Sequence, residues 1–196
     1  MAYKDLREFI SDLESHGMLK RITQEVDAHL EITEITDRVS KMKGAGNVAL
    51  LFENVKGYDM PVLMNAYGSD ERMAMALGVE KLDDIADEIR EILKLPYISL
   101  QNKMNLVSLI PMAKRAINFP KYVKSAPCQE VVEEHPSLDK IPILTCWPKD
   151  GGPFVTLPLV FTKNPKTGKR NVGMYRLQKY DAQTTGMHWH IHKNGA

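Results

Sequence analysis

The sequence has no hydrophobic run long enough to cross a membrane, few cysteines and no excess of charge of either sign. A membrane-spanning helix needs about 20 consecutive apolar residues, and residues 1–9 also lack the apolar stretch of a secretion signal. The 26 Lys and Arg residues balance the 25 Asp and Glu residues, so nothing attracts the chain as a whole to nucleic acid or to an acidic membrane surface. These absences predict a cytoplasmic protein without a transmembrane segment and without a nucleic-acid partner.

The cysteines are too few to hold the fold together by disulfides. Cys128 and Cys146 are also too far apart in the sequence for a C-x-x-C motif. Both are therefore predicted to be reduced thiols that are buried as small apolar side chains. The composition, with 43% hydrophobic and 26% charged residues, is typical of an ordinary globular chain of one or two domains.

The first half of the chain alternates between helical and strand patterns. Helical spacing of apolar residues predicts a helix over residues 5–16 and another that begins near residue 31 and that Gly44 closes. Ser69 is the predicted N-cap of a helix with Asp70 and Glu71 in its first turn, and apolar residues between Leu82 and Leu93 predict a further helix that Pro96 terminates. Short apolar runs predict strands at 19–23, 48–52 and 61–67. We therefore expect an α/β domain over residues 1–102.

The second half changes in composition. Pro111 and Pro120 interrupt any helix at 112–117, so residues 103–126 are predicted to be a crossing segment. Strands are predicted at 129–132, 141–145, 155–161, 171–177 and 187–192, with a hairpin at 164–168 whose Lys and Arg residues are interpreted as a solvated tip. Residues 127–196 thus form a β-rich domain, and the chain as a whole belongs to the α+β class.

The last 26 residues gather side chains that suit a binding site. Side chains alternate along a regular strand, so His188, His190 and His192 would share one face of the predicted strand at 187–192. Neutral imidazole binds divalent metals, and imidazole also donates hydrogen bonds to phosphate and carbonyl oxygens. The residues themselves leave both uses open. They are also compatible with an ordinary exposed sheet face that binds nothing.

Asn171 and Arg176 are five positions apart, which places them on opposite faces of an unbroken strand. Gly173 between them permits a bulge that would turn both toward one cavity. The planar guanidinium of Arg176 suits a carboxylate or a phosphate, although an Arg on an edge strand also serves as a plain surface residue.

These segments resemble a known family. The runs NVGMYRLQ (171–178) and MHWHIHKNG (187–195) resemble the two cofactor-cradling segments of UbiD-type decarboxylases, which remove carbon dioxide from aromatic or unsaturated acids with prenylated FMN. The run DLREFI (5–10), with the helix at 31–38, is similar to the amino-terminal domain of the family. IPIL (141–144) before Trp147 and Pro148 is similar to the lead into its flavin domain. The resemblance covers the whole chain.

The resemblance implies a structure and a set of site residues. Residues 127–196 would begin a split β-barrel that holds prenylated FMN, a divalent metal that is typically manganese, and in some members a potassium ion. Asn171 and His192 would be metal ligands, and Arg176 would be the catalytic residue that orients the substrate carboxylate. The residues implied to contact the cofactor are Met174, Tyr175, Arg176, His188, Trp189, His190, Lys193 and Asn194. His190 departs from the family, which more often carries an amide there.

The resemblance also implies an activity. The reaction would be the non-oxidative decarboxylation of 4-hydroxybenzoate, of a polyprenylated hydroxybenzoate as in ubiquinone biosynthesis, or of another aryl or acrylic acid, with the flavin as electron sink. The implied partners are that small acid, further copies of the chain in a dimer or hexamer, and a flavin prenyltransferase that supplies the cofactor. Family members continue for hundreds of residues beyond the position of Ala196 and carry the acidic metal ligand and the proton-transfer acid there. The polypeptide alone is therefore expected to be inactive.

Two other functions are compatible with the residues. The three histidines could bind zinc in a small hydrolytic metalloprotein. The outer two of them would however lie roughly 13 Å apart at about 3.3 Å per residue, so that only two could bind one ion without distortion. The chain could also be a non-catalytic assembly subunit of a split enzyme.

Overall fold

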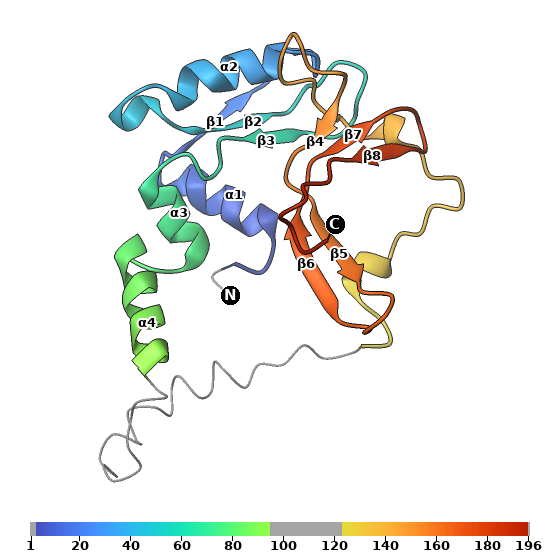
Figure 1. Cartoon of the computed structure of the whole chain (residues 1–196). Helices are drawn as coiled ribbons and strands as arrows, with labels where there is room; N and C mark the ends of the chain where they lie inside the picture. The colour runs from blue at the N-terminus through green and yellow to red at the C-terminus, as the bar shows by residue number, and fades with distance from the viewer. Residues whose placement is uncertain (1–2, 95–122, 196) are drawn as a thin grey trace.

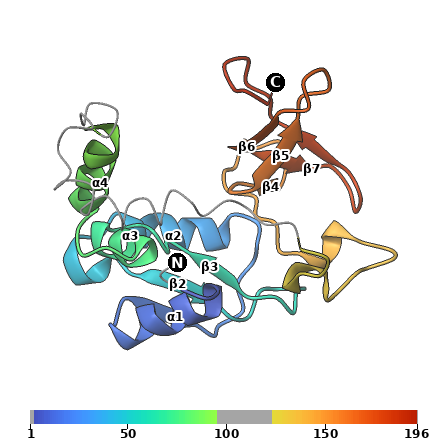
Figure 2. The same cartoon turned by 90° about the horizontal axis from the view of Figure 1, so that it is seen from below.

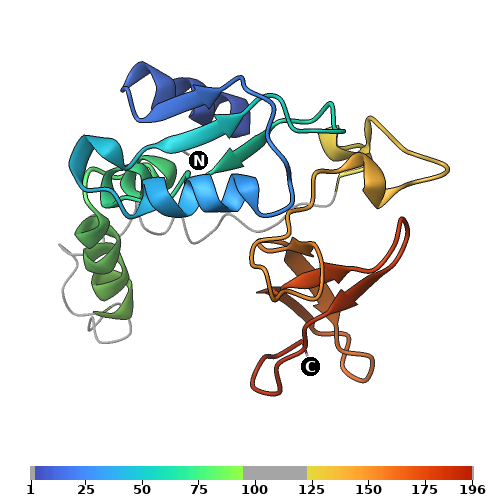
Figure 3. The same ribbon diagram turned by 90° about the horizontal axis from the view of Figure 1, so that it is seen from above.

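Two groups of secondary-structure elements lie side by side in the structure, which is a computed structural model and describes residues 3–94 and 123–195 (Figures 1, 2 and 3). The first group contains helices on both faces of a small sheet, and the second contains short strands, turns and two 3-10 helices of one turn each. The mixture confirms the α+β class. The predicted helix end before Pro96, the stretch at 112–117 and most of the crossing segment at 103–126 lie outside the described residues.

A three-stranded sheet organises the amino-terminal group. Its strands are β1 (Leu19–Ile22), β2 (Ala49–Phe52) and β3 (Val62–Met64). β1 pairs parallel with β2, and β2 pairs antiparallel with β3. A parallel pair needs a crossover connection, which α2 (Glu31–Ser40) supplies. Helix α1 (Leu6–Ser15) covers the face opposite α2, as Figure 1 shows.

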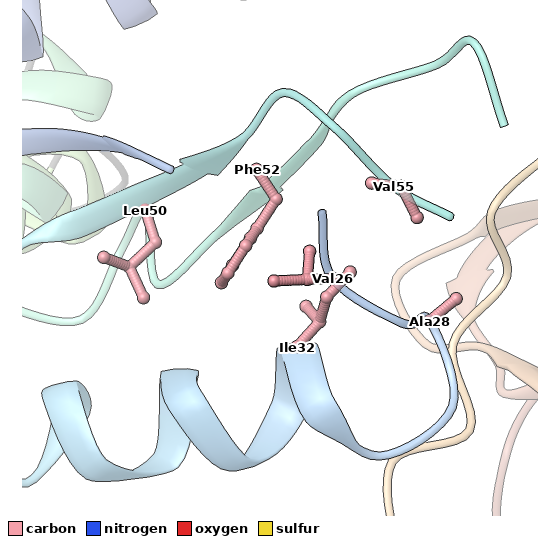
Figure 4. Close-up of a cluster of buried hydrophobic side chains, with 6 residues drawn as sticks. All are labelled: Val26, Ala28, Ile32, Leu50, Phe52 and Val55. Atoms are coloured by element: carbon pink, nitrogen blue, oxygen red, sulfur yellow. The ribbon is translucent and has the colours of Figure 1, made fainter. Parts of the chain in front are cut away.

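The central strand β2 supplies side chains to a hydrophobic layer on each side of the sheet. Leu50 and Phe52 pack in the layer that contains Ile32 of α2 (Figure 4). Ala49 packs in the other layer, with Leu13 of α1. All four residues of β2 are buried, which explains why the run ALLF has no polar alternation. Burial of a Leu or Phe side chain contributes roughly 1.5 to 3 kcal/mol, so these layers hold the group together.

Side chains cap the starts of two helices, and Ser69 does so as predicted. The side chain of Asp5 accepts hydrogen bonds from the backbone N–H groups at the start of α1, and Ser69 does the same for α3 (Asp70–Leu77). Helix α4 (Leu82–Lys94) follows. Helix α2 ends at Ser40 and does not reach Gly44, because the backbone N–H of Met42 turns back to the carbonyl of Val39.

The carboxy-terminal group contains five short strands in two sheets. β4 (Phe154–Val155), β7 (Leu177–Lys179) and β8 (Thr185–Met187) form an antiparallel sheet in the order β4-β7-β8. β5 (Leu159–Lys163) and β6 (Arg170–Met174) form a separate antiparallel pair. The loop between them contains Gly168 in the left-handed region, with its N–H bonded to the carbonyl of Asn164, which confirms the predicted hairpin.

Two predicted strands are each divided in two. The run at 155–161 breaks around Pro158, which has no backbone N–H for a sheet. The run at 171–177 breaks at Tyr175 and Arg176, where the chain leaves β5 as its partner and joins β4 and β8. The β5–β6 register continues without interruption from one end to the other, so the predicted bulge at Gly173 is wrong.

Three other strand predictions are wrong wholly or in part. The run at 129–132 follows a 3-10 turn, and its Val131 and Val132 side chains are 81% and 78% exposed. The run at 141–145 is extended but makes only an isolated bridge between Thr145 and His29. The last strand ends at Met187, because its partner β7 offers only three residues for pairing. These runs contain the residue types that favour strands. Within the described residues, however, no partner strand pairs with them over the predicted lengths.

The two groups meet where residues 141–148 pass the start of α2. The N–H of Leu30 donates to the carbonyl of Thr145 at 3.0 Å, and the N–H of Thr145 donates to the carbonyl of Ala28 at 3.2 Å. Leu144 packs against the hydrophobic layer beneath α2. The β-rich group is therefore attached to the helical group by main-chain hydrogen bonds and one apolar anchor.

The structure also bears on the predictions for the two cysteines and for a membrane-spanning helix. Both thiols are free, as predicted, but Cys128 is exposed and Cys146 is only half-buried, so the prediction that both are buried is wrong. Within the described ranges, the helices are all too short or too polar to pass through a bilayer.

The Tyr3 hydroxyl links the chain start to α1 and makes stability depend on pH. It donates to Asp12 at 2.6 Å, and this hydrogen bond is the main reason that the pKa of Tyr3 is raised to about 12. An unfolded tyrosine titrates near pH 10, so the stabilisation is complete below about pH 10 and is lost as the pH rises toward 12. We expect Tyr3→Phe to destabilise the protein in urea unfolding at about pH 8 and to have a smaller effect at about pH 11. An equal effect at both would contradict this.

Candidate functional site

A polar hollow of about 340 Å³ lies where the β5–β6 hairpin meets the last residues of the chain. Asn171 and Asn194 both line it, so the structure brings together two of the residues predicted for the site. The other lining residues are Thr162, Lys163, Asn164, Pro165, Thr167, Lys169, Arg170 and Gly195. The described lining thus combines amides, hydroxyls and three cationic side chains, with no acidic side chain among them.

Asn171 lies in the middle of β6, opposite Thr162 of β5. Its side chain is half-buried, and its amide nitrogen is 3.5 Å from the Thr162 hydroxyl, which is a weak contact. No hydrogen bond to its amide oxygen occurs within the described part of the chain. Met174 belongs to the opposite, outer face of the hairpin, where its side chain is 48% exposed. The hollow is therefore lined by the Asn171 side chain and not by Met174.

Tyr175 anchors the final segment of the chain. Its side chain is 3% exposed, and its hydroxyl accepts a hydrogen bond from the N–H of Gly195 at 2.9 Å. The Trp189 ring meets the Tyr175 ring edge-on at 5.6 Å, and Lys193 Nζ is 4.8 Å from the centre of the same ring. Lys193 also donates to the carbonyl of Met174. Residues 188–195 are thus folded over a buried tyrosine rather than extended as a strand.

Two glycines make this close packing possible. A Cβ atom at Gly173 would lie 2.6 Å from the Tyr175 ring, and one at Gly195 would lie 2.3 Å from the Tyr175 hydroxyl. Both distances are far below van der Waals contact. The backbone of β6 and that of the final turn therefore approach Tyr175 as closely as they do because neither residue has a side chain.

Arg176 follows directly and is held by two contacts. Its Nη2 atom donates to Asp150 Oδ2 at 2.9 Å, and its guanidinium carbon lies 3.6 Å from the centre of the Phe154 ring. The side chain of Arg176 is 39% exposed and that of Asp150 is 14% exposed. The guanidinium is therefore fixed in orientation while part of it faces solvent.

The histidines do not form the predicted face. His188, His190 and His192 are all exposed, and they follow β8 instead of belonging to it. The His190 and His192 rings lie 5.2 Å apart, but the described residues contain no group of three or more His, Cys, Asp or Glu placed to hold a metal ion. The hollow that contains Asn171 is not lined by His192. The prediction of one shared strand face is wrong, whereas the proposed contacts of these residues with a cofactor stay predictions.

The donor set of the hollow indicates what it could hold. Amide and hydroxyl groups beside Lys163, Lys169 and Arg170 suit a phosphate group, which needs hydrogen-bond donors and positive charge. Of the two predicted metal ligands, the hollow offers a hard divalent metal the Asn171 amide oxygen but not the His192 imidazole, which does not line it. The described residues therefore fit a phosphate well and supply only part of a metal shell.

Sequence reasoning missed several residues of this region. The basic residues of the hairpin were interpreted as a solvated tip, yet three of them line the hollow. Asp150 and Phe154 received no role, although they hold Arg176. Gly151 and Gly152 indicate a turn between Asp150 and Phe154. A turn in the sequence does not show, however, which distant side chain its neighbours will contact.

Two family models and curated sequences from other organisms match the chain. The model of the 3-octaprenyl-4-hydroxybenzoate carboxy-lyase N-terminal domain matches residues 10–92, and the model of the Rift-related domain of that carboxy-lyase matches residues 121–196. An uncharacterized protein of Archaeoglobus fulgidus is 52% identical over 197 residues, which cover 100% of this chain and 39% of the relative. One of Aquifex aeolicus is 48% identical over 194 residues, with 98% and 40% covered. The chain thus spans about two fifths of the length of these relatives.

Two solved enzyme structures also match most of this chain. The evolved dimeric form of the UbiD-class enzyme HmfF from Pelotomaculum thermopropionicum, in complex with prFMN, matches with a TM-score of 0.71 and 28% identity over 96% of this chain and 39% of that one. The closed form of vanillic acid decarboxylase from Sedimentibacter hydroxybenzoicus matches with a TM-score of 0.71 and 28% identity over 94% and 37%.

Proposed function

Because this chain belongs to the 3-octaprenyl-4-hydroxybenzoate carboxy-lyase (UbiD) family, we propose that it forms the amino-terminal portion of a non-oxidative decarboxylase that uses prenylated FMN and a divalent metal. The observation that carries the proposal is the succession of two domains of one carboxy-lyase family along the chain, with the polar hollow inside the second. The substrate would be an aromatic or unsaturated acid, such as 4-hydroxybenzoate or a polyprenylated hydroxybenzoate of ubiquinone biosynthesis.

The site residues would divide the work between phosphate, flavin and substrate. Lys163, Lys169 and Arg170 would neutralise the cofactor phosphate at the hollow, and Asn171 and His192 would contribute ligands to manganese, with potassium as a further ion. When bound, prenylated FMN supplies the electron sink that decarboxylation needs. Arg176 would orient the substrate carboxylate. The residues that would surround the cofactor are Met174, Tyr175, Arg176, His188, Trp189, His190, Lys193 and Asn194.

The domain division proposed for this chain is 1–102, 103–126 and 127–196, with the last part contributing the first strands of a split barrel. It is supported by the matched ranges 10–92 and 121–196. The acidic metal ligand and the proton-transfer acid would be supplied by residues other than those of this chain. The polypeptide alone would accordingly bind ligand without completing the reaction.

The proposed partners follow from the same family membership. They are a small aromatic acid, further copies of the protein in a dimer or hexamer, and a flavin prenyltransferase that supplies the cofactor in the cytoplasm. The small zinc protein considered from the sequence is not favoured, since the described residues hold no three-ligand cluster and the family match points elsewhere. The non-catalytic assembly subunit of a split enzyme is likewise not favoured, since both matched models belong to a carboxy-lyase.

Binding of FMN tests the proposal, with riboflavin as the ligand that lacks the phosphate. We expect Arg170→Gln to weaken FMN binding by about three- to tenfold and to leave riboflavin binding unchanged, because a charge-assisted contact to phosphate contributes about 1 kcal/mol. Fluorescence titration measures both affinities. Lys166→Gln is the matched control, since Lys166 belongs to the same hairpin but does not line the hollow. An equal loss for both ligands, or no FMN binding to the native chain, would contradict the proposal.

A further inference from the structure

Arg176 is held by two side chains that come from one short segment of the fold. Asp150 accepts its Nη2 hydrogen bond at 2.9 Å, and the Phe154 ring lies 3.6 Å from its guanidinium carbon. Phe154 belongs to β4, which pairs with β7 directly after Arg176, in the register Phe154↔Gln178. The pairing of β4 with β7 therefore fixes Phe154 relative to Arg176, and Asp150 lies in the turn just before β4.

The two contacts act on the guanidinium in different ways. A guanidinium carbon 3.6 Å from the ring centre is in cation–π contact with Phe154, so the ring limits the directions in which the N–H groups can point. Asp150 occupies Nη2, and Arg176 makes no other side-chain hydrogen bond within residues 3–94 and 123–195. The remaining N–H groups of the fork are available to a ligand on the exposed side.

We propose that Phe154 and Asp150 are positioning residues for Arg176 with opposite effects on a carboxylate ligand. Phe154 presents the guanidinium in the orientation that the carboxylate needs. Asp150 holds the guanidinium while the site is empty and competes with the incoming carboxylate for it. The inference rests on the proposed function, because it requires that Arg176 receives a carboxylate.

The competition follows from charge and burial. Asp150 is 14% exposed, so water and salt screen its charge less than that of a surface acid. A carboxylate that binds Arg176 shares the cation with Asp150 and is repelled by it, which weakens binding. A neutral ligand is not repelled by Asp150 and does not draw the guanidinium of Arg176 away from it. Asp150 thereby lowers the affinity of Arg176 for a carboxylate ligand. Once that ligand has left, Asp150 pairs with Arg176 again.

Benzoate and its neutral isostere benzamide are the probes for this proposal. Binding to the native chain is followed by the ¹⁵N NMR resonance of Arg176 Nε–H. Asp150→Asn is expected to tighten benzoate binding by about three- to tenfold and to leave benzamide binding unchanged. Phe154→Leu is expected to weaken benzoate binding by a similar factor and, without ligand, to shift the Arg176 resonance because the aromatic ring is gone. Asp139→Asn, which removes an acid paired with Lys179 on the same sheet, is the charge-matched control and should change neither affinity.

Several results would overturn the inference. They are unchanged or weaker benzoate binding in Asp150→Asn, unchanged binding in Phe154→Leu, or no benzoate binding to the native chain and to Asp150→Asn alike. The FMN titration described above separates this failure from failure of the proposed function. If FMN binds as expected and any of these results is obtained, the roles of Asp150 and Phe154 are wrong and the flavin site stands.

Discussion

Replacement of Arg72 by methionine is expected to lower the free energy of unfolding by about 3 to 4 kcal/mol. The Arg72 side chain is 2% exposed and donates to the Asn47 carbonyl at 2.6 Å, the Asn47 side-chain oxygen at 2.9 Å and the Asn65 carbonyl at 3.2 Å. Methionine fills a similar volume but donates no hydrogen bond. The Asn47 carbonyl therefore loses the donor that Arg72 supplies, while the Asn47 side-chain oxygen and the Asn65 carbonyl keep only the donors Asn65 and Gly68. Urea unfolding followed by circular dichroism measures the loss.

The surroundings of Arg72 explain why the effect should be large. No carboxylate contacts it among the described residues, and burial lowers the pKa of its guanidinium, so its charge is balanced by carbonyl and amide dipoles. The network continues from Asn65 to Asn47 and Val48, and Asn65 has a φ of 54°. A Cβ atom at Gly68 would lie 1.8 Å from the Asn65 side-chain oxygen. The loop before α3 is therefore shaped around this one cation.

The control for this substitution is an exposed arginine on a helix. Arg90 pairs with Asp87 one turn away, and both side chains are 68% exposed. Arg90→Met should change the free energy of unfolding by less than about 0.5 kcal/mol, because an exposed ion pair contributes little. If Arg72→Met were no more destabilising than Arg90→Met, the network would not have the importance that its burial indicates.

Gly173→Ala is expected to weaken FMN binding by about tenfold and to cost about 1 to 3 kcal/mol of stability. The new Cβ atom would lie 2.6 Å from the Tyr175 ring. That ring cannot move away easily, because Trp189 and Lys193 contact it and Gly195 is bonded to its hydroxyl. Displacement of Tyr175 would therefore carry the final segment, including Asn194 at the hollow, out of place. FMN titration and urea unfolding measure the two effects.

The neighbouring residue provides the matched control. Val172 belongs to the other face of β6 and is 48% exposed, so Val172→Ala should leave FMN affinity nearly unchanged. In a Tyr175→Leu background, where the ring is absent, Gly173→Ala should add little further loss of stability, since the two substitutions act on the same contact. Full additivity of the two substitutions would show that Gly173 has another role.

The amino-terminal group could be predicted well because its signals are local. Helical spacing predicted the helix over residues 5–16, and Ser69 was predicted as an N-cap; the structure confirms that helix and that cap. The buried run ALLF was also sufficient to predict β2. The Arg72 network could not be predicted, because it depends on Asn47 and Asn65, which are brought together only when the strands pair.

The carboxy-terminal group was predicted less well for a physical reason. The lengths of short antiparallel strands are set by their partners, and the pattern within one run does not show where the partner ends. The strand predicted at 187–192 was wrong on this account, and so was the unbroken strand through Tyr175 and Arg176. Asn171 and Asn194 were each assigned to the site through a family resemblance, and both line the hollow, whereas the contacts of Arg176 with Asp150 and Phe154 required the fold.

The order of elements in the amino-terminal sheet also determines when it can form. β1, α2, β2 and β3, with α1 before them, all lie within the first 64 residues. During synthesis this sheet and both of its covering helices have left the ribosome before the β-rich group is translated, so its two hydrophobic layers can close first. Thr145 then meets a finished surface at His29, and the later strands fold against a platform that is already in place.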